Sequence, residues 1–334
     1  MALLEVNNLR TSFFTEKGEI PVLRGVSFSL DEGKALGIVG ESGSGKSITV
    51  YSILGLLQKP GQVVGGSVKL RGKELIGTAE SDMRKIRGNK ISIIFQDPMT
   101  SLNPTKTVGD QIAEAILLHT ERTHKEAKER TLELLKLVNI SDSEKRMRQY
   151  PFELSGGMRQ RVMIAMALAC EPDILIADEP TTALDVTIQA EILDLISSLK
   201  ESLRMAVIMI THDLGVVART CDDVVVMYAG EICESGSVTD IFYNPKHEYT
   251  KGLLRSVPDA DSESGRLHAI RGSVGELHSG IVGCPFMPRC DKAMKICKER
   301  NADTMSFGNK HIARCWENQR KLYEHRLRHD NAED

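Results

Sequence analysis

The feature that most constrains the fold is a glycine-rich segment, GESGSGKS, that begins at residue 40. It fits the pattern G-x-x-x-x-G-K-[ST], and an apolar run (Ala35–Val39) precedes it while a helix-like stretch (Ser47–Leu57) follows. A strand, a glycine-rich turn and a helix in this order form a cradle whose backbone N–H groups face phosphate oxygens. The sequence therefore predicts an α/β fold with a phosphate-binding loop. The residues expected to bind the nucleotide here are Gly40, Ser42, Gly43, Ser44, Gly45, Lys46 and Ser47.

Two of these residues and a downstream acid pair have predicted chemical roles. Lys46 is expected to place its charge on the β- and γ-phosphates, and the Ser47 hydroxyl is expected to ligate Mg²⁺. Asp178 and Glu179 follow the apolar run Ile174–Ala177, and acids at the carboxyl end of a parallel strand lie where such sheets bind ligands. Asp178 is suited to hold Mg²⁺, and Glu179 to polarise a water for attack on the γ-phosphate.

Two further polar residues end apolar runs. Gln96 follows Ile91–Phe95, and His212 follows Val207–Thr211. On a parallel sheet both lie near the nucleotide edge. Gln96 is expected to reach the metal or the attacking water through its amide oxygen, and His212 to hydrogen-bond a γ-phosphate oxygen.

Alternating strand and helix patterns predict a mixed, mostly parallel sheet covered on both faces. The strand candidates are Ala35–Val39, Ile91–Phe95, Ile174–Ala177, Ala206–Thr211 and Val224–Tyr228. Between Gln96 and Cys170 the pattern becomes helical, most clearly over Gln111–His119 and Thr123–Val138. We therefore expect an ATPase domain over residues 1–240, with a helical subdomain over residues 97–170, and a small C-terminal domain over residues 241–334.

Composition excludes several classes of protein. The 43 Lys and Arg against 46 Asp and Glu give a net charge of −3, which argues against a nucleic-acid-coating chain. A hydrophobic content of 41% supports a folded core. No apolar run approaches the roughly 20 residues of a membrane helix, and the first residues do not fit a signal peptide. A cytosolic chain with seven cysteines, an odd number, is not expected to use a disulfide framework.

A second glycine-containing helix start lies at Leu154-Ser155-Gly156-Gly157-Met158-Arg159-Gln160, before the apolar pattern Val162–Leu168. The free N–H groups at this helix start could also bind an anion, although a single nucleotide needs only one phosphate-binding loop. This segment resembles the signature of ATP-binding cassette (ABC) ATPases. The resemblance covers residues 3–235. It rests on the order of the phosphate loop, Gln96, the signature, the acid pair, the Ala183-Leu184-Asp185 loop and His212.

The resemblance implies a head-to-tail pair of cassettes that share their nucleotides. Ser155, Gly156 and Gly157 would face the γ-phosphate held by the partner's loop, and Asp185 would lie at the dimer contact. An aromatic side chain near the N-terminus would stack on the adenine. We choose Phe13 for this role, with Phe14 as the alternative on the opposite face of the strand. A membrane partner would dock beside the Gln96 loop and the helical insertion.

Four cysteines gather near the C-terminus as Cys284-x5-Cys290-x6-Cys297-x17-Cys315. Four soft ligands in a region with few core-forming residues indicate a structural metal centre. Structural zinc prefers tight pairs of cysteines, whereas gaps of this length favour an iron–sulfur cluster, which we take as [4Fe–4S]. Zinc and free thiols remain the alternatives.

The same region resembles the C-terminal part of oligopeptide and dipeptide permease ATPases, and most closely the dipeptide-permease branch. The resemblance rests on NPKHEYT over residues 244–250, where the family has Pro in place of Glu248, and on the cysteine arrangement. Within that motif His247 is expected to be a loop residue with no ligand role. The resemblance implies an ATPase that powers peptide import from the cytoplasmic face of the membrane. Its partners would be a second, similar ATPase, two membrane permease subunits and, indirectly, an extracytoplasmic peptide-binding protein, with no nucleic acid.

Three alternatives stay open. The same branch serves nickel importers. A soluble ABC ATPase for DNA or ribosome work is disfavoured, because Gly45 and Ser155 are too close in sequence for a long coiled coil and the chain has one cassette. A metal-sensing regulator would leave the hydrolytic residues unexplained.

Overall fold

The computed structural model describes residues 2–182, 184–256, 270–273 and 282–320. These residues form two compact units, each assembled from distant parts of the chain. The first unit draws on Met1–Leu4, Leu30–Ala35 and Leu70–Ile210, and the second on Glu5–Ser29, Leu36–Lys69 and Thr211–Asp334. The domain boundary expected near residue 240 stays a prediction, because the units interleave along the chain.

In the described residues of the second unit, strands are hydrogen-bonded in the order β11-β12-β10-β9-β3. They span Ala35–Val39 (β3), Asp223–Tyr228 (β9), Glu231–Ser237 (β10), Met305–Ser306 (β11) and Ile312–Ala313 (β12). β3 and β9 are parallel, with Leu36 opposite Asp223, and the pairs that involve β10 or β11 are antiparallel. The helices α1 (Lys46–Leu54) and α9 (Leu214–Thr220) belong to this unit. α9 packs closely on β3, because a Cβ at Gly37 would lie 2.8 Å from Val217 Cγ1.

A second sheet in this unit contains the longest strands in the described part of the chain, in the order β2-β1-β4. They span Leu4–Thr15 (β1), Gly18–Leu30 (β2) and Gly61–Leu70 (β4). Buried and exposed residues mix along these strands, as expected for a sheet with one solvated face. Phe13 lies near the end of β1, with its ring against Gly61, where a Cβ would meet Phe13 Cε1 at 2.9 Å.

The first unit is built around three parallel strands, β6 (Ile91–Ile94), β7 (Ile174–Asp178) and β8 (Ala206–Thr211). β7 lies between the other two, with Ile91 opposite Ile174 and Ile174 opposite Ala206. Their side chains are almost all buried, which matches the continuous apolar runs of parallel strands. The expected mixed, mostly parallel α/β sheet is confirmed.

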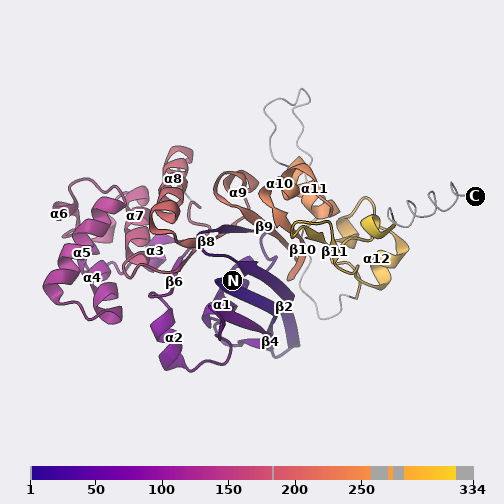
Figure 1. The fold of residues 1–334 in the computed structure, drawn as a ribbon, viewed down its shortest axis with the longest axis horizontal. Coiled ribbons are helices and arrows are strands. Elements are labelled where there is room, and N and C mark those ends of the chain that lie inside the picture. The colour runs from indigo at the N-terminus through magenta and orange to yellow at the C-terminus, as the bar shows by residue number, and fades with distance from the viewer. Residues whose placement is uncertain (1, 183, 257–269, 274–281, 321–334) are drawn as a thin grey trace, which may run out of the picture. The chain divides into compact units, whose positions relative to one another are not determined.

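Helices form the rest of the first unit, and α4, α5 and α6 lie together with α7 (Figure 1). Thr107 caps α4, and Thr123 and Glu126 form a capping box at the start of α5, so both helices begin where side-chain oxygens satisfy free N–H groups. Both helices lie where the helical pattern over Gln111–His119 and Thr123–Val138 predicts them, and the subdomain bounds of 97–170 stay a prediction. The other elements of the first unit are the short strand β5 (Lys73–Glu74), the helices α2 (Glu80–Ile86), α3 (Pro98–Ser101), α4 (Val108–His119), α5 (His124–Leu137), α6 (Ser143–Arg146), α7 (Gly156–Ala167) and α8 (Val186–Leu203), and a 3-10 turn (Pro151–Glu153).

The C-terminal region joins the core of the second unit. Tyr249 and Phe286 share a buried cluster with Val39 and Tyr228, and β12 extends the sheet beside β10. The region therefore packs into the unit that carries the phosphate loop. Its helical elements are α10 (Val238–Tyr243), α11 (Glu248–Arg255), a 3-10 turn (Met287–Arg289) and α12 (Lys295–Glu299).

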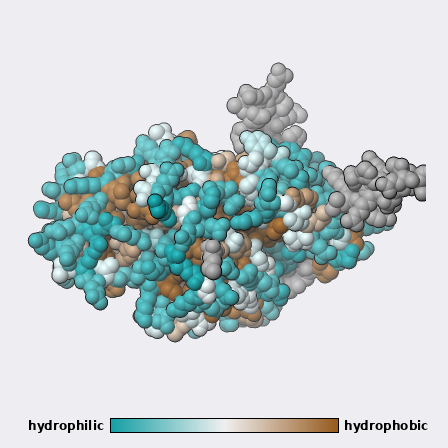
Figure 2. Space-filling model, viewed as in Figure 1, coloured by the Kyte–Doolittle hydropathy of each residue, from teal (hydrophilic) through white to brown (hydrophobic). Residues whose placement is uncertain are grey.

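None of the helices in the described part of the chain combines the length and the apolar character that a membrane crossing requires. On the face drawn in Figure 2, hydrophilic residues predominate and hydrophobic residues gather in separate patches.

Candidate nucleotide site and cysteine cavity

The phosphate loop lies between β3 and α1, where the sequence predicts it. Gly40 has no room for a side chain, because a Cβ there would lie 2.3 Å from the Met227 carbonyl oxygen and 2.7 Å from Ser44 Oγ. Gly45 precedes α1 with φ of 102°, a left-handed conformation that favours glycine. The glycine spacing is thus required by the curled backbone that exposes N–H groups to phosphate.

The interior of the loop carries a buried cation and a buried hydroxyl. Lys46 is 6% exposed, and its Nζ donates to the carbonyl oxygens of Gly40 (2.7 Å) and Glu41 (3.0 Å). Ser44 Oγ is buried and has no hydrogen-bond partner among the described residues. A charged amine and an orphaned hydroxyl in one glycine-rich loop fit the recognition of phosphate oxygens. Ser42 and Gly43 are exposed on the loop, and Ser47 is half-buried.

The first unit brings Gln96 and Glu179 together. Gln96 Nε2 donates to Glu179 Oε2 (3.0 Å), and the Thr182 hydroxyl donates to the same oxygen (3.0 Å). The Glu179 backbone has φ of 46°, and a left-handed conformation costs a non-glycine residue about 1–2 kcal/mol. Such strain concentrates at functional sites. Sequence reasoning missed Thr182, which lies in a turn of no particular pattern.

The predicted signature turn opens α7. Ser155 is the N-cap, and its hydroxyl accepts a hydrogen bond from the Met158 N–H (3.4 Å). Ser155 and Gly156 are exposed, so this helix start is accessible. Gly157 has a packing role as well, because a Cβ there would lie 2.8 Å from Ile188 Cγ2 of α8.

The remaining predicted nucleotide-site residues lie at ends of elements. Asp178 is the last residue of β7 and is 2% exposed, Asp185 is the N-cap of α8, and His212 directly follows β8 and is exposed. Phe13 is half-buried, whereas Phe14 is 43% exposed. The functional roles of these residues stay predictions.

Glu41 has partners that sequence reasoning missed. Arg289 donates from Nη1 to Glu41 Oε2 (2.7 Å) and from Nη2 to Glu41 Oε1 (3.1 Å). The Glu41 N–H donates to the Tyr249 hydroxyl (2.9 Å). These partners lie more than 200 residues from Glu41 in the chain, so no local pattern could have indicated them.

The four C-terminal cysteines line one small cavity of about 20 Å³, together with apolar side chains such as Phe286 and Met294. All seven cysteines of the chain are free, so no disulfide joins these four. Burial raises the pKa of the Cys284 thiol to about 12 and that of Cys290 to about 11. Within the described ranges, no three His, Cys, Asp or Glu side chains are close enough to hold a metal as they stand. The thiols therefore face a common space without forming a closed ligand set.

His247 lies beside this cavity and caps α11, where its Nδ1 accepts a hydrogen bond from the Tyr249 N–H (3.1 Å). It is 3% exposed, and burial lowers its pKa to about 4. Fully buried Glu234 accepts hydrogen bonds from the His247 N–H (2.8 Å) and the Lys246 N–H (2.6 Å). His311 Nε2 lies 2.8 Å from the same carboxylate. His247 is therefore part of a buried polar network rather than of an open loop.

The phosphate loop, the strand-end acid pair and the signature helix define an ATP-binding cassette ATPase. A family model described as "ABC transporter" matches residues 23–182. A second, described as "Oligopeptide/dipeptide transporter, C-terminal region", matches residues 233–297.

Proteins and structures similar to the chain agree with this class. A probable peptide ABC transporter ATP-binding protein of Sinorhizobium fredii is 54% identical over 94% of both chains. A dipeptide transport ATP-binding protein of Bacillus subtilis is 50% identical over 99% of both chains. The solved dimeric structure of MJ0796, a bacterial ABC transporter cassette, is 29% identical, with a TM-score of 0.63 over 70% of this chain and 98% of that one. The chain therefore belongs to the ATP-binding subunits of the oligopeptide/dipeptide family of ABC transporters, and it is an ATPase.

Proposed function

We propose that this chain is the ATP-hydrolysing subunit that powers import of dipeptides or oligopeptides through a membrane ABC transporter. The observation that carries the substrate class is its similarity along nearly the whole chain, C-terminal region included, to peptide transport ATP-binding proteins. The oligopeptide transport ATP-binding protein OppD of Salmonella typhimurium, 52% identical over 88% of both chains, supports the same class.

ATP binding is assigned to the phosphate loop. Backbone N–H groups of the loop other than that of Glu41, together with the Ser44 hydroxyl and Lys46, would bind phosphate oxygens, and Phe13 would stack on the adenine. The Ser47 hydroxyl and the Asp178 carboxylate, with the Gln96 amide oxygen, are hard oxygen donors of the kind Mg²⁺ prefers. Bound Mg²⁺ would neutralise charge on the β- and γ-phosphates.

Hydrolysis is assigned to Glu179. Its Oε2 accepts two hydrogen bonds, from Gln96 and Thr182, which orient the carboxylate for its proposed role in polarising the attacking water. Gln96 is therefore both a candidate metal ligand and an orienting group for the base. His212 would hydrogen-bond a γ-phosphate oxygen.

A second ATPase subunit would complete the site. In the turn of Ser155, Gly156 and Gly157 the first two residues are exposed, which makes this helix start accessible to a nucleotide held by a neighbouring chain. Asp185 is followed by Val186, whose side chain is 83% exposed at the start of α8, and an exposed apolar residue at this position fits a subunit contact. We propose a head-to-tail dimer, with a sister ATPase as the partner in the full transporter.

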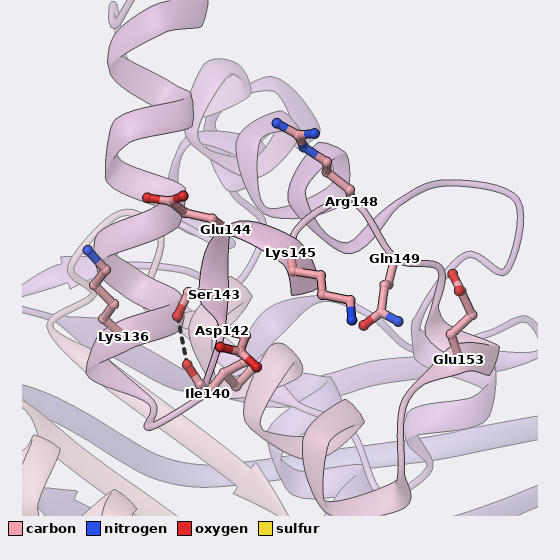
Figure 3. A pocket seen from close by; sticks show the side chains of 9 residues that line it. All are labelled: Lys136, Ile140, Asp142, Ser143, Glu144, Lys145, Arg148, Gln149 and Glu153. Carbon is pink, nitrogen blue, oxygen red and sulfur yellow. Dashed lines mark hydrogen bonds between the residues drawn. The ribbon is translucent and has the colours of Figure 1, made fainter.

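The helical insertion is the proposed dock for the membrane permease subunits, which would hold the chain at the cytoplasmic face of the membrane. A hollow of about 1030 Å³ lies along α5 and α6, lined by side chains of both charges such as Lys136, Glu144 and Arg148 (Figure 3). Beside it, the exposed rings of Tyr150 and Phe152 stack 5.6 Å apart. Exposed aromatic rings beside a polar surface are typical of protein–protein interfaces, which suits a cytosolic segment of a membrane protein.

We propose that the cysteine cavity holds an iron–sulfur cluster of the [4Fe–4S] type. Four free thiols on one cavity with apolar walls fit the soft donor set of such a cluster. The raised pKa values of Cys284 and Cys290 mean that a cationic centre is needed to keep these thiols as thiolates. When bound, the cluster would cross-link the segment from Cys284 to Cys315.

The hydrolysis proposal is tested with Glu179→Gln, assayed with the permease subunits in membrane vesicles. We expect unchanged ATP binding, a fall in ATP turnover of about 10²–10⁴-fold, and loss of labelled dipeptide uptake. The matched control is Glu171→Gln, since Glu171 is another carboxylate on a left-handed backbone but forms a surface ion pair with Arg130. Full turnover in Glu179→Gln would disprove the base assignment, and uptake of Ni²⁺ without peptide would reject the substrate class.

The cluster proposal is tested on protein purified without oxygen. We expect a brown protein with iron and acid-labile sulfide in a ratio near one, and loss of the colour in Cys297→Ser but not in Cys170→Ser. Stoichiometric zinc, or no metal, would reject it.

A further inference from the structure

One side chain of the phosphate loop is tied to the C-terminal region at both its carboxylate and its backbone. The Glu41 carboxylate receives two parallel hydrogen bonds from Arg289, and the Glu41 N–H donates to Tyr249. All three residues belong to the second unit. The loop that holds the triphosphate is therefore fastened to residues that follow it by more than 200 positions.

Arg289 is a rigid anchor. Its side chain is 7% exposed, and Nε donates to the Arg271 carbonyl oxygen (2.8 Å). Nη2 also donates to the Gly272 carbonyl oxygen (3.2 Å), and Nη1 lies 3.3 Å from the Tyr228 hydroxyl. Paired N–H groups in a fixed planar fork hold a carboxylate in one orientation, which a lysine could not do.

Tyr249 is equally fixed. It is fully buried, with its ring edge-on to Tyr228 at 4.7 Å and tilted against Phe286 at 5.3 Å. Its hydroxyl is thus held by packing, and the Glu41 N–H is directed toward it rather than into the loop.

We propose that Arg289 and Tyr249 are positioning residues for the phosphate loop, through which the C-terminal region sets the affinity of this subunit for ATP. This goes beyond the proposed function, because it assigns the cysteine-rich region a role in the nucleotide site whether or not that region binds a cluster.

The physical reason is charge as well as geometry. A carboxylate on a loop that binds a triphosphate repels the ligand, and at partly buried sites such interactions are strong because the effective dielectric constant is far below that of water. Arg289 neutralises this carboxylate and holds it in one orientation through both of its oxygens. Without Arg289, the Glu41 charge is uncompensated and the loop loses its outer tether.

The test measures binding of fluorescent N-methylanthraniloyl-ATP with Mg²⁺ to the full chain. We expect Arg289→Met to raise Kd at least tenfold, equivalent to about 1.4 kcal/mol. We expect Glu41→Gln to bind at least as tightly as the wild type, because it removes the repelling charge while its amide oxygen still accepts from Arg289. The double variant should return to within about threefold of the wild type. In steady-state hydrolysis, Arg289→Met should raise KM for ATP and leave kcat at saturation within twofold.

Arg314→Met is the matched control. Arg314 precedes Cys315 as Arg289 precedes Cys290, but it pairs with Glu231 (3.3 Å) instead of the phosphate loop. Its Kd should not change. A merely structural role predicts that Arg289→Met and Glu41→Gln both weaken binding and that the double variant is not rescued, and this outcome overturns the proposal. Should Arg289→Met fail to fold, Glu41→Gln decides alone, since weaker ATP binding in that variant also overturns it.

Discussion

Glu234 is the residue whose replacement most directly tests how the C-terminal region is attached. Its buried carboxylate accepts from Lys246 N–H and lies within hydrogen-bond distance of His311 through Oε1, and it accepts from His247 N–H through Oε2. In Glu234→Gln the amide oxygen can replace only one of these oxygens. The best arrangement places NH₂ against the His247 N–H, so two donors face each other.

The expected cost follows from that arrangement. One charge-assisted hydrogen bond is lost, about 1.5–3 kcal/mol, and a buried N–H is left unsatisfied, so we expect a loss of about 2–4 kcal/mol. Differential scanning fluorimetry should register this as a fall in apparent Tm of roughly 5–10 °C. Because both changes act on the segment that carries α11, hydrogen exchange should rise there first.

Glu231→Gln is the control on the same strand. Both donors to Glu231, Asn301 Nδ2 (2.6 Å) and Arg314 Nη1 (3.3 Å), bind one oxygen, Oε2, which the amide of Gln can reproduce. We expect a cost below about 1 kcal/mol for it. If Glu234→Gln were as stable as Glu231→Gln, the buried network would not be what fastens this region.

Two further predictions concern His247 and Gly157. Because burial lowers the His247 pKa to about 4 while the unfolded side chain titrates near 6.5, the unfolded state binds more protons between these values. Stability is therefore lost as the pH falls through this window, by about 2 kcal/mol at pH 5, and denaturation at pH 7 and pH 5 should show a smaller loss in His247→Asn. Gly157→Ala should destabilise the α7–α8 contact by about 1–3 kcal/mol through its clash with Ile188, and Ile188→Ala should relieve it. An ATPase defect that persists in the relieved double variant would show that Gly157 has a role besides packing.

Much of the ATPase part could be predicted from the sequence because its signals are local. The phosphate loop has its chemistry and its flanking strand and helix within about twenty residues, and β3 and β8 begin and end as expected. The helical insertion was predictable from its periodicity and from Thr123, which caps α5. Of the long strands, β1 was expected only as the strand that carries Phe13 and Phe14, and β2 and β4 were missed, because their partly exposed faces lack the continuous apolar runs of parallel strands.

The C-terminal region was harder to predict because its order depends on distant contacts. Local pattern indicated few core residues there, yet Tyr249 and Phe286 pack against β3 and β9 residues. From the sequence, His247 was expected to be an ordinary loop residue. Its contacts with Glu234 and with the start of α11 depend on the fold. Likewise, nothing in the local sequence of Arg289 distinguishes it from the neighbouring basic residues Lys292, Lys295 and Lys298.

The shared core of the second unit has a practical consequence for building hybrid transporters. An ATPase subunit truncated after β10 would lose Tyr249 and Phe286. It would then lack the two rings that pack against Tyr228 and the hydroxyl that accepts a hydrogen bond from the phosphate loop. When ATPase subunits are exchanged between related importers, the transferred segment should therefore extend at least to Asn318, whose side-chain amide donates to the Lys246 carbonyl oxygen. A shorter segment would include every hydrolytic motif and still lack the C-terminal residues that hold the phosphate loop in place.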